Sequence, residues 1–273
     1  MNEPIVVGVD GSAGAAVALE WAAAEAGLWH APLLLVHSSK LLEPGSMLDE
    51  QALERLREER MRLLESTREG LLRRDPGLTV DVRLERDDPA LALVDLGERA
   101  RMTVVGSRGA GGFERLLLGS VGLHVAAHGH KPVVVVPRGW EGEHAARIVL
   151  GVDERHAESQ AIGWAFAEAQ RRGAPLTALH AVNGYGAPRQ VIGEHMELSE
   201  ALGGWCSRYP DVVVERLPVE ASAARALVEA TVSAALVVVG ARRRKRGFGM
   251  ILGHVNHAVL HHAACPVAVV PEG

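Results

Sequence analysis

Four short segments of this 273-residue chain occur twice in the same order, and this internal repeat limits the possible folds more than any other feature. The first two pairs are separated by 143 residues and the last two by 134. The pairs are IVVGVD at 5–10 and IVLGVD at 148–153, LLLVH at 33–37 and LTALH at 176–180, VVG at 104–106 and 238–240, and KPVVVVP at 131–137 and CPVAVVP at 265–271. The repeat predicts two tandem domains, residues 1–138 and 147–273, joined by a charged, glycine-containing linker.

Within each half, short apolar runs alternate with longer helical patterns, which is typical of strand–helix units on a parallel sheet. The expected strands of the first half are 5–10, 33–37, 80–84, 103–106 and 133–136, and the expected helices are 15–27, 48–74, 89–100 and 120–128. The sequence therefore predicts an α/β fold of two doubly wound domains. Each is expected to be an open five-stranded parallel sheet of order 3-2-1-4-5 with helices on both faces.

The helix expected at 48–74 is rich in charge. Glu54, Arg55 and the run 57–60 stand at spacings that allow ion pairs one turn apart. This pattern predicts an amphipathic helix with a solvated outer face.

Composition narrows the functional classes. The net charge is −5 and the pI is near 6.2, which argues against a general nucleic-acid binder. No apolar run approaches the roughly 20 residues that span a bilayer, and the N-terminus does not resemble a signal peptide. Two cysteines far apart, Cys206 and Cys265, fit free thiols in a reducing compartment. A cytoplasmic protein without membrane or nucleic-acid partners is expected.

The order 3-2-1-4-5 places a switch point between the first and fourth strands, where the crossover direction reverses. Ligands of such sheets bind beyond the carboxyl ends of the strands at that point. In the first half these ends carry Asp10, Gly11 and Ser12 and a glycine-rich loop that begins at Gly106. The two most distinctive loops of the half are therefore expected to lie side by side.

The loop at 106–121 has five glycines within fourteen residues and ends at the start of an expected helix. Glycines allow close backbone approach to a ligand, and successive N–H groups in such a loop can hold phosphate oxygens. A tight turn is the alternative explanation for one or two of them. The loop lacks the Gly-Lys-Ser/Thr of a P-loop, and no Gly-x-Gly-x-x-Gly follows the first strand, so a nicotinamide cofactor is not expected. Asp10 is a candidate for binding adenosine or Mg²⁺.

The pattern Gly-x2-Gly-x9-Gly-Ser, matched at Gly106, Gly109, Gly119 and Ser120, resembles the ATP-binding signature of the universal stress protein family. The segments GVDGS at 8–12 and KPVVVVP at 131–137 also resemble that family, and the tandem arrangement is similar to actinobacterial forms. The resemblance implies an adenine near Asp10 and His37–Ser38, and a ribose and phosphates along 106–112 and 119–121. It also implies nucleotide-dependent regulation under stress. The candidate ATP-binding residues are Gly8, Asp10, Gly11, Ser12, Ser38, Gly106, Ser107, Arg108, Gly109, Gly111, Gly112, Gly119, Ser120 and Val121.

The second half departs from this pattern. Arg243 stands at the position of Gly109 and His254 at that of Ser120, while Gly253 matches Gly119. An arginine where the backbone must approach closely would fill the phosphate space, so this half is expected to have lost standard ATP binding. The basic run 242–246 is expected to be a solvated, degenerate phosphate loop, and two alternatives stay open, an anion held by side chains and a patch for an anionic partner.

Histidines recur on the last helix of each half. His254, His257 and His261 fall on one helix face, with His262 beside them, and the pair His124 and His128 is spaced i, i+4. Such spacing can bind a transition metal, but no cysteine or carboxylate completes a tetrahedral set. No metal site is therefore predicted.

The leading hypothesis is a regulatory protein in which ATP occupancy changes a conformation or oligomeric state that a protein partner reads. A slow ATPase or phosphotransferase is the alternative, with Asp10, Glu114 and His124 as candidate groups, none at a diagnostic spacing. A ligand-free scaffold is a third possibility. The choice between ATP, AMP and a cyclic nucleotide stays open. The apolar edge strands at 133–136 and 267–270 are expected to pair the halves as an intramolecular pseudo-dimer, and a homodimer is possible.

Overall fold

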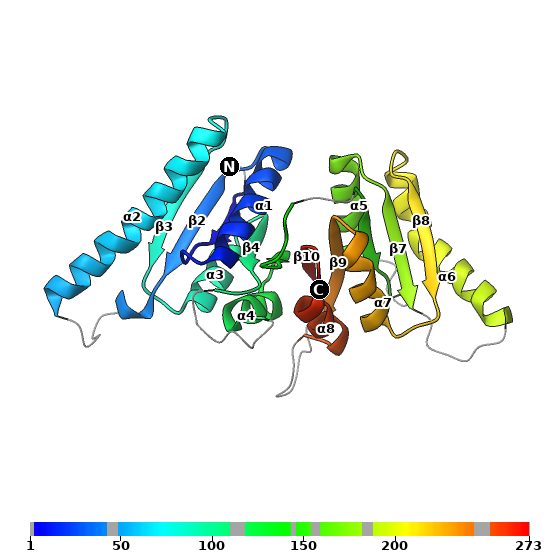
Figure 1. Cartoon of the computed structure of the whole chain (residues 1–273). Coiled ribbons are helices and arrows are strands. Elements are labelled where there is room, and N and C mark those ends of the chain that lie inside the picture. Colours follow the sequence, from blue (N-terminus) through cyan, green and yellow to red (C-terminus); the bar gives the residue numbers. More distant parts are fainter. Residues whose placement is uncertain are drawn as a thin grey trace. The chain divides into compact units, whose positions relative to one another are not determined.

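The computed structural model of the chain forms two compact units, residues 1–138 and 139–273. The structure describes residues 3–42, 49–109, 118–142, 146–153, 159–181, 188–242 and 252–272. Figure 1 shows the order of the helices and strands along the chain. Each unit is described separately below.

The first unit alternates strands and helices from end to end. Its elements are β1 (Ile5–Gly8), α1 (Ala13–Trp29), β2 (Leu33–Ser38), a short 3-10 turn (Lys40–Leu42), α2 (Glu50–Arg74), β3 (Val80–Glu85), α3 (Pro89–Gly97), β4 (Met102–Gly106), α4 (Ser120–His128) and β5 (Val133–Val136). All strand pairs of the unit are parallel: β1 with β2 and β4, β2 with β3, and β4 with β5. The strand order is therefore β3-β2-β1-β4-β5, which confirms the predicted doubly wound topology.

The core of this sheet consists of β-branched and aliphatic residues that are buried on both faces. All four valines of β5 are at most 2% exposed, and Ile5, Val6 and Val7 of β1 are fully buried. A parallel sheet covered by helices on both faces requires such continuous apolar strands. The strands that surround the switch point therefore lie in the core of the unit.

Helix α1 begins and ends at recognisable caps. The Ser12 side chain accepts a hydrogen bond from the Ala15 backbone N–H at 3.1 Å, and His30 adopts a left-handed conformation at the C-terminal cap. Ser12 satisfies one of the N–H groups that a helix N-terminus leaves unpaired. Its side chain therefore fixes where the helix begins, directly after the strand end that carries Asp10.

Helix α2 is longer than the sheet it packs against. Its 25 residues span about 37 Å, whereas the six residues of β2 span about 20 Å. Its buried residues, Leu64 and Leu71, both lie in the C-terminal half. That half covers the sheet, and the N-terminal half extends past the carboxyl ends of the strands (Figure 1).

The second unit repeats this arrangement. Its elements are β6 (Ile148–Gly151), α5 (Gln160–Arg172), β7 (Leu176–Ala181), α6 (Pro188–Arg208), β8 (Val214–Val219), α7 (Ala223–Ala230), a 3-10 turn (Thr231–Ser233), β9 (Leu236–Arg242), α8 (His254–His262) and β10 (Val267–Glu272). Parallel pairing gives the order β8-β7-β6-β9-β10. In the aligned repeat, Ala13 of α1 corresponds to position 156, so α5 begins one turn later than α1 does.

An aromatic cluster joins α5 to α6. The ring of Phe166, which is fully buried, lies 6.3 Å from Trp205 and 5.7 Å from Tyr209. A Cβ on Gly163 would lie 2.5 Å from the Trp205 ring, so only glycine lets the indole approach α5 this closely. The cluster fixes how these two helices pack.

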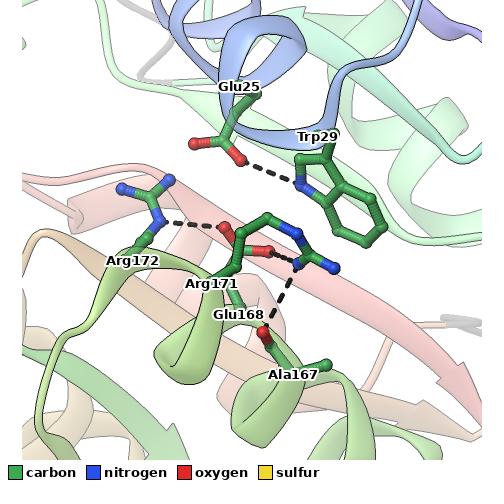
Figure 2. Close-up of polar contacts among 6 residues, drawn as sticks. All are labelled: Glu25, Trp29, Ala167, Glu168, Arg171 and Arg172. Carbon is green, nitrogen blue, oxygen red and sulfur yellow. Dashed lines mark hydrogen bonds and ion pairs between the residues drawn. The ribbon is translucent and has the colours of Figure 1, made fainter.

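Each first helix carries a buried glutamate at the same position of the repeat. In α1, Glu25 is 1% exposed and accepts a hydrogen bond from Trp29 Nε1 at 3.3 Å (Figure 2). In α5, Glu168 is fully buried and accepts from Arg172 Nε at 2.8 Å and Arg171 Nη1 at 3.1 Å (Figure 2). A buried carboxylate needs such partners to offset its loss of hydration. The hydrogen-bond donors to both glutamates lie within one turn of the same helix.

Within the described ranges, no helix combines the length and the apolar character that crossing a bilayer requires.

Candidate functional site

The candidate site of the first unit begins where β1 and β4 end. The two strands pair from Ile5 with Met102 to Val7 with Val104, so their carboxyl ends share one edge of the sheet. After β1 the chain enters α1, and after β4 the Ser107 N–H donates to the Val136 carbonyl at 2.8 Å. The two loops predicted to meet therefore start from neighbouring strands.

Three glycines let the loop after β4 lie against the first turn of α1. A Cβ on Gly106 would lie 2.5 Å from the Gly14 carbonyl oxygen, and a Cβ on Gly14 would overlap the Arg108 carbonyl oxygen. Gly11 has a positive φ of 81°, which glycine adopts without strain. The fit is one of backbone against backbone, and any side chain at Gly14 or Gly106 would force the two segments apart.

Asp10 lies between these loops. Its Oδ1 accepts a hydrogen bond from the Ser12 N–H at 2.9 Å, which holds the carboxylate at the end of β1. A Cβ on Gly109 would lie 2.5 Å from Asp10 Oδ2, so the carboxylate faces the backbone of the glycine loop. Asp10, Gly11, Ser12, Gly106 and Gly109 are thus brought together, as the switch-point argument predicts.

A hydrogen bond joins the end of the glycine loop to its start. The Gly119 N–H donates to the Ser107 carbonyl at 2.7 Å, and α4 begins at Ser120 with Gly119 as its cap residue. Gly119 has no side chain with which to cap this helix, and among the described residues no side chain caps it, so its first N–H groups and the positive end of its dipole face the end of the loop. Ser120 is exposed and Val121 is half-buried. Gly111, Gly112 and Glu114 lie outside the described residues.

Three predicted site residues make structural contacts that the sequence does not reveal. Ser107 is 7% exposed, and its Oγ accepts a hydrogen bond from the Arg138 N–H at 3.1 Å, which ties the loop to the end of β5. A Cβ on Gly8 would lie 3.2 Å from Leu93 of α3, so the glycine makes room for a helix. Ser38 Oγ donates to the Asp87 carbonyl at 2.6 Å and joins the ends of β2 and β3.

His37 forms the base of the site at the end of β2. It is 6% exposed, and its Nδ1 lies 2.7 Å from the Val9 carbonyl oxygen. Because a carbonyl only accepts, Nδ1 carries the proton. Burial lowers the pKa of His37 below its usual 6.5, the charge of Arg60 lowers it further, and the Val9 hydrogen bond and Asp10 oppose these effects. The imidazole is therefore neutral at neutral pH.

Folding stability is expected to fall as the solution is acidified below pH 6.5. The pKa of His37 is lower in the folded chain than its usual value of 6.5, so the unfolded chain binds more protons in that range. The stabilisation is complete above pH 6.5 and is lost as the pH falls through the folded-state pKa. Urea midpoints between pH 7.5 and 5 test this, with His37→Gln expected to flatten the slope. The control His130→Gln, at an exposed site, should leave the slope as it is; an equal slope for His37→Gln and the unaltered chain would contradict the expectation.

Arg60 lies near the site. The charge pattern of α2 had led us to expect this residue on the solvated face of the helix. Its side chain is 31% exposed, and its charge acts on His37. One turn further along, Leu63 lies 3.7 Å from the position of a Cβ on Gly11. The signal in the sequence is weak: Leu53, Leu56, Arg60, Leu63 and Thr67 recur at helical spacing, with one cation in an otherwise largely apolar stripe.

The equivalent region of the second unit is built differently. Here the Glu272 carboxylate, at the end of β10, takes the place beside Gly240 that the first turn of α1 takes beside Gly106. A Cβ on Gly240 would lie 2.7 Å from Glu272 Oε1. This carboxylate accepts hydrogen bonds from the N–H groups of Gln160 at 3.0 Å and Ala161 at 3.3 Å, and from the Ser159 hydroxyl. Arg243 lies outside the described residues, and His254 is the first residue of α8.

The histidine pairs stack. The His124 and His128 rings lie 4.0 Å apart on α4, and His257 and His261 lie 4.3 Å apart on α8. Burial and the adjacent imidazoles lower the pKa values of His124 and His261, with Asp88 opposing the shift at His124. In the described part of the chain, no group of three or more His, Cys, Asp or Glu side chains has an arrangement that could hold a metal.

Known proteins match both units. The model of the universal stress protein family matches residues 1–137 and 145–271. A universal stress protein of Mycolicibacterium smegmatis is 37% identical over 97% of this chain and 96% of its own length, and one of Mycobacterium tuberculosis is 35% identical over 98% and 96%. The crystal structure of a universal stress protein from Archaeoglobus fulgidus, 18% identical, covers 99% of this chain and 98% of its own with a TM-score of 0.75 and has the same fold. With two matches to the family model and relatives that extend along nearly its whole length, the chain belongs to the universal stress protein family.

Proposed function

We propose that the first unit binds ATP at the carboxyl ends of β1 and β4, and that the protein acts as a nucleotide-dependent regulator in the stress response. The observation that carries this proposal is the meeting of the Asp10 carboxylate with the backbone at Gly109. A phosphate-binding loop needs N–H groups unobstructed by side chains, and an uncapped helix N-terminus nearby favours an anion. Gly106 and Gly109 provide loop backbone without side chains, and α4 begins at Ser120 with a glycine at its cap position.

The Asp10 carboxylate at the glycine loop is a suitable ligand for a Mg²⁺ ion that binds together with the nucleotide. Mg²⁺ in nucleotide sites is commonly held by one or two carboxylates and by the phosphates. Asp10 supplies a carboxylate at the loop, and no described cluster would hold the ion without the nucleotide. Asp10 would therefore hold Mg²⁺ together with the phosphates.

The second unit is proposed to bind ATP weakly or not at all. The carboxylate of Glu272 lies at the start of α5 and beside Gly240, and it places a negative charge where the first unit has uncharged backbone. A second negative group would be repelled there. One nucleotide per chain is the expected stoichiometry.

The substitution Gly109→Arg tests the proposal. It introduces the residue of the second unit, and its Cβ alone would meet Asp10 Oδ2. We expect it to lower ATP affinity about tenfold or more, which corresponds to at least about 1.4 kcal/mol. Nucleotide released from the purified protein and titration calorimetry with ATP measure this.

The matched control is Gly139→Arg. Gly139 is exposed, and a Cβ there would meet nothing within 4 Å, so the same charge is added without filling the site. The proposal is wrong if the unaltered protein binds no ATP, or if both arginine variants bind it as tightly as the unaltered protein does.

A further inference from the structure

Ser107 uses its N–H, its carbonyl and its hydroxyl to bond to three different parts of the first unit. The N–H donates to the Val136 carbonyl at 2.8 Å, the carbonyl accepts from the Gly119 N–H at 2.7 Å, and Oγ accepts from the Arg138 N–H at 3.1 Å. Ser107 is only 7% exposed, and hydrogen bonds that are shielded from water are stronger than those at the surface. This residue therefore connects the end of β5 with the cap of α4.

The bond between the Ser107 hydroxyl and Arg138 lies where the pairing of β4 with β5 stops. In a parallel ladder the bonding N–H groups of one strand donate to backbone carbonyls of the next strand. The Arg138 N–H donates to a side-chain oxygen instead, and the paired register ends at Gly106 with Val136. The Ser107 carbonyl, which a continued ladder would use, accepts the Gly119 N–H.

The second unit has alanine, without a hydroxyl, at the aligned position 241. Its strands β9 and β10 stay paired through Ala241 with Pro271 and Arg242 with Glu272. This pairing continues past the aligned point at which β4 and β5 part. The presence of the hydroxyl thus coincides with a strand pair that stops early, and its absence with one that continues.

The bond from Gly119 to the Ser107 carbonyl sets where α4 begins relative to the glycine loop. Gly119 is the cap residue of α4, and a Cβ on it would lie 3.7 Å from the Arg108 Cα and 3.8 Å from the Gly109 nitrogen. The start of the helix therefore lies against the loop backbone. At Gly253, the counterpart in the second unit, no described residue lies within 4 Å of the Cβ position. Ser107 thus holds together the two sources of N–H groups in the proposed phosphate site.

We propose that Ser107 is a positioning residue of the nucleotide site, whose hydroxyl ends the β4–β5 pairing and frees its carbonyl to hold the start of α4 beside the glycine loop. The hydroxyl acts on the loop and does not touch the nucleotide. A loop that already has the binding geometry loses less conformational entropy when the ligand arrives. This inference rests on the proposed function, because it assigns a role within the same site.

Amide hydrogen exchange without nucleotide, resolved by residue in NMR spectra, tests the exchange of hydrogen-bond partners. In Ser107→Ala the Arg138 N–H loses its acceptor and is expected to bond to the carbonyl of residue 107, as a continued ladder requires. We expect the Gly119 amide to exchange at least about tenfold faster and the Arg138 amide to stay protected. Unchanged protection of Gly119 would overturn the inference. Equal loss of protection at both amides would also overturn it, because it would indicate only a loosened unit.

Titration of the full-length protein with ATP tests the consequence for binding. Ser107→Ala is expected to weaken binding about 3- to 10-fold, the usual effect of one lost hydrogen bond. Ser107→Thr keeps a hydroxyl at the same position and should bind within about twofold of the unaltered protein. The matched control is Ser207→Ala, which removes a hydroxyl that donates to the Gly203 carbonyl at 3.0 Å in the second unit. It should change the affinity less than about twofold.

The two measurements separate this inference from the proposed function. If the unaltered protein binds no ATP, the proposed function is wrong, and so is the placement of Ser107 in a nucleotide site. If it binds ATP but Ser107→Ala behaves like Ser207→Ala, the inference alone is wrong. Equal losses of affinity in Ser107→Ala and Ser107→Thr would also contradict it, because the hydroxyl would not be the group that matters.

Thermal midpoints first show which variants fold. If Ser107→Ala does not fold, Ser107→Cys takes its place in both measurements. The cysteine Sγ is a weak acceptor of similar shape, so the same changes are expected to a smaller degree. Their absence in Ser107→Cys would count against the inference in the same way.

Discussion

Replacing Gly14 by alanine is expected to destabilise the first unit by about 3 kcal/mol, an effect at the upper end of the usual range for overpacking. The added Cβ would overlap the carbonyl oxygen of Arg108, a backbone atom that cannot rotate away as a side chain can. Either the first turn of α1 or the loop after β4 must move. The two loops that form the candidate site would separate, so ATP binding should be lost as well.

The matched control lies in the same helix. Gly27 of α1 has nothing within 4 Å of the position of its Cβ, and alanine is the better helix former by about 1 kcal/mol. Gly27→Ala should therefore be neutral or stabilising. Hydrogen exchange of peptides from residues 3–42 and 89–109 measures both variants. Equal protection in Gly14→Ala and the unaltered chain would show that the close backbone contact is not present.

Replacing Phe166 by alanine is expected to destabilise the second unit by about 3 to 5 kcal/mol. Phe166 is fully buried and packs against Trp205 of α6 and Tyr209, the residue that follows α6, so its removal leaves a cavity beside these two rings. Relaxation into the cavity is restricted, because Trp205 already lies against Gly163. The expected signs are a lower urea midpoint and a changed environment of the Trp205 indole in fluorescence.

The control for this substitution is Val232→Ala in the same unit. Val232 is 79% exposed, and truncation at such a position usually changes stability by less than about 0.5 kcal/mol. If Phe166→Ala and Val232→Ala lower the stability by the same small amount, the aromatic cluster does not hold α5 and α6 together.

The topology of each unit was predictable because the sheet is buried on both faces. Continuous valine-rich segments such as 133–136 are hard to place anywhere except in a covered parallel strand. The repeat then supplied the number of units, and the alternation of strands and helices supplied the order. From that order alone Asp10 could be placed beside the loop at Gly106, 96 residues later in the chain.

The finer division of tasks among the site residues was not predictable. The sequence shows that Gly8 and Gly109 are glycines, but only packing shows that one makes room for Leu93 and the other faces Asp10. Arg60 was hidden for a related reason. A cation in a helix full of charges looks solvated, and its true environment depends on how far α2 extends past the strands.

The role of Glu272 was missed because it depends on a contact between residues more than a hundred positions apart. Comparison of the two halves shows that Gly240 corresponds to Gly106. No sequence feature near Glu272 indicates that its carboxylate, at the end of β10, accepts hydrogen bonds from the start of α5. Acidic side chains are generally stabilised at helix N-termini. When the acidic residue is distant in the sequence, the sequence alone does not show which residue occupies that position.

The carboxylate cap at α5 also bears on how the two halves diverged after duplication. The first half has Arg138 at the position that aligns with Glu272. An exchange of the last strands between the halves would bring a cation to the positive end of α5, and a carboxylate to a loop that is proposed to hold phosphates. The start of α5 at Gln160 and the acidic residue at 272 are therefore linked by these hydrogen bonds. The two halves have the same strand order, but their last strands could not be exchanged without placing the wrong charge at each site.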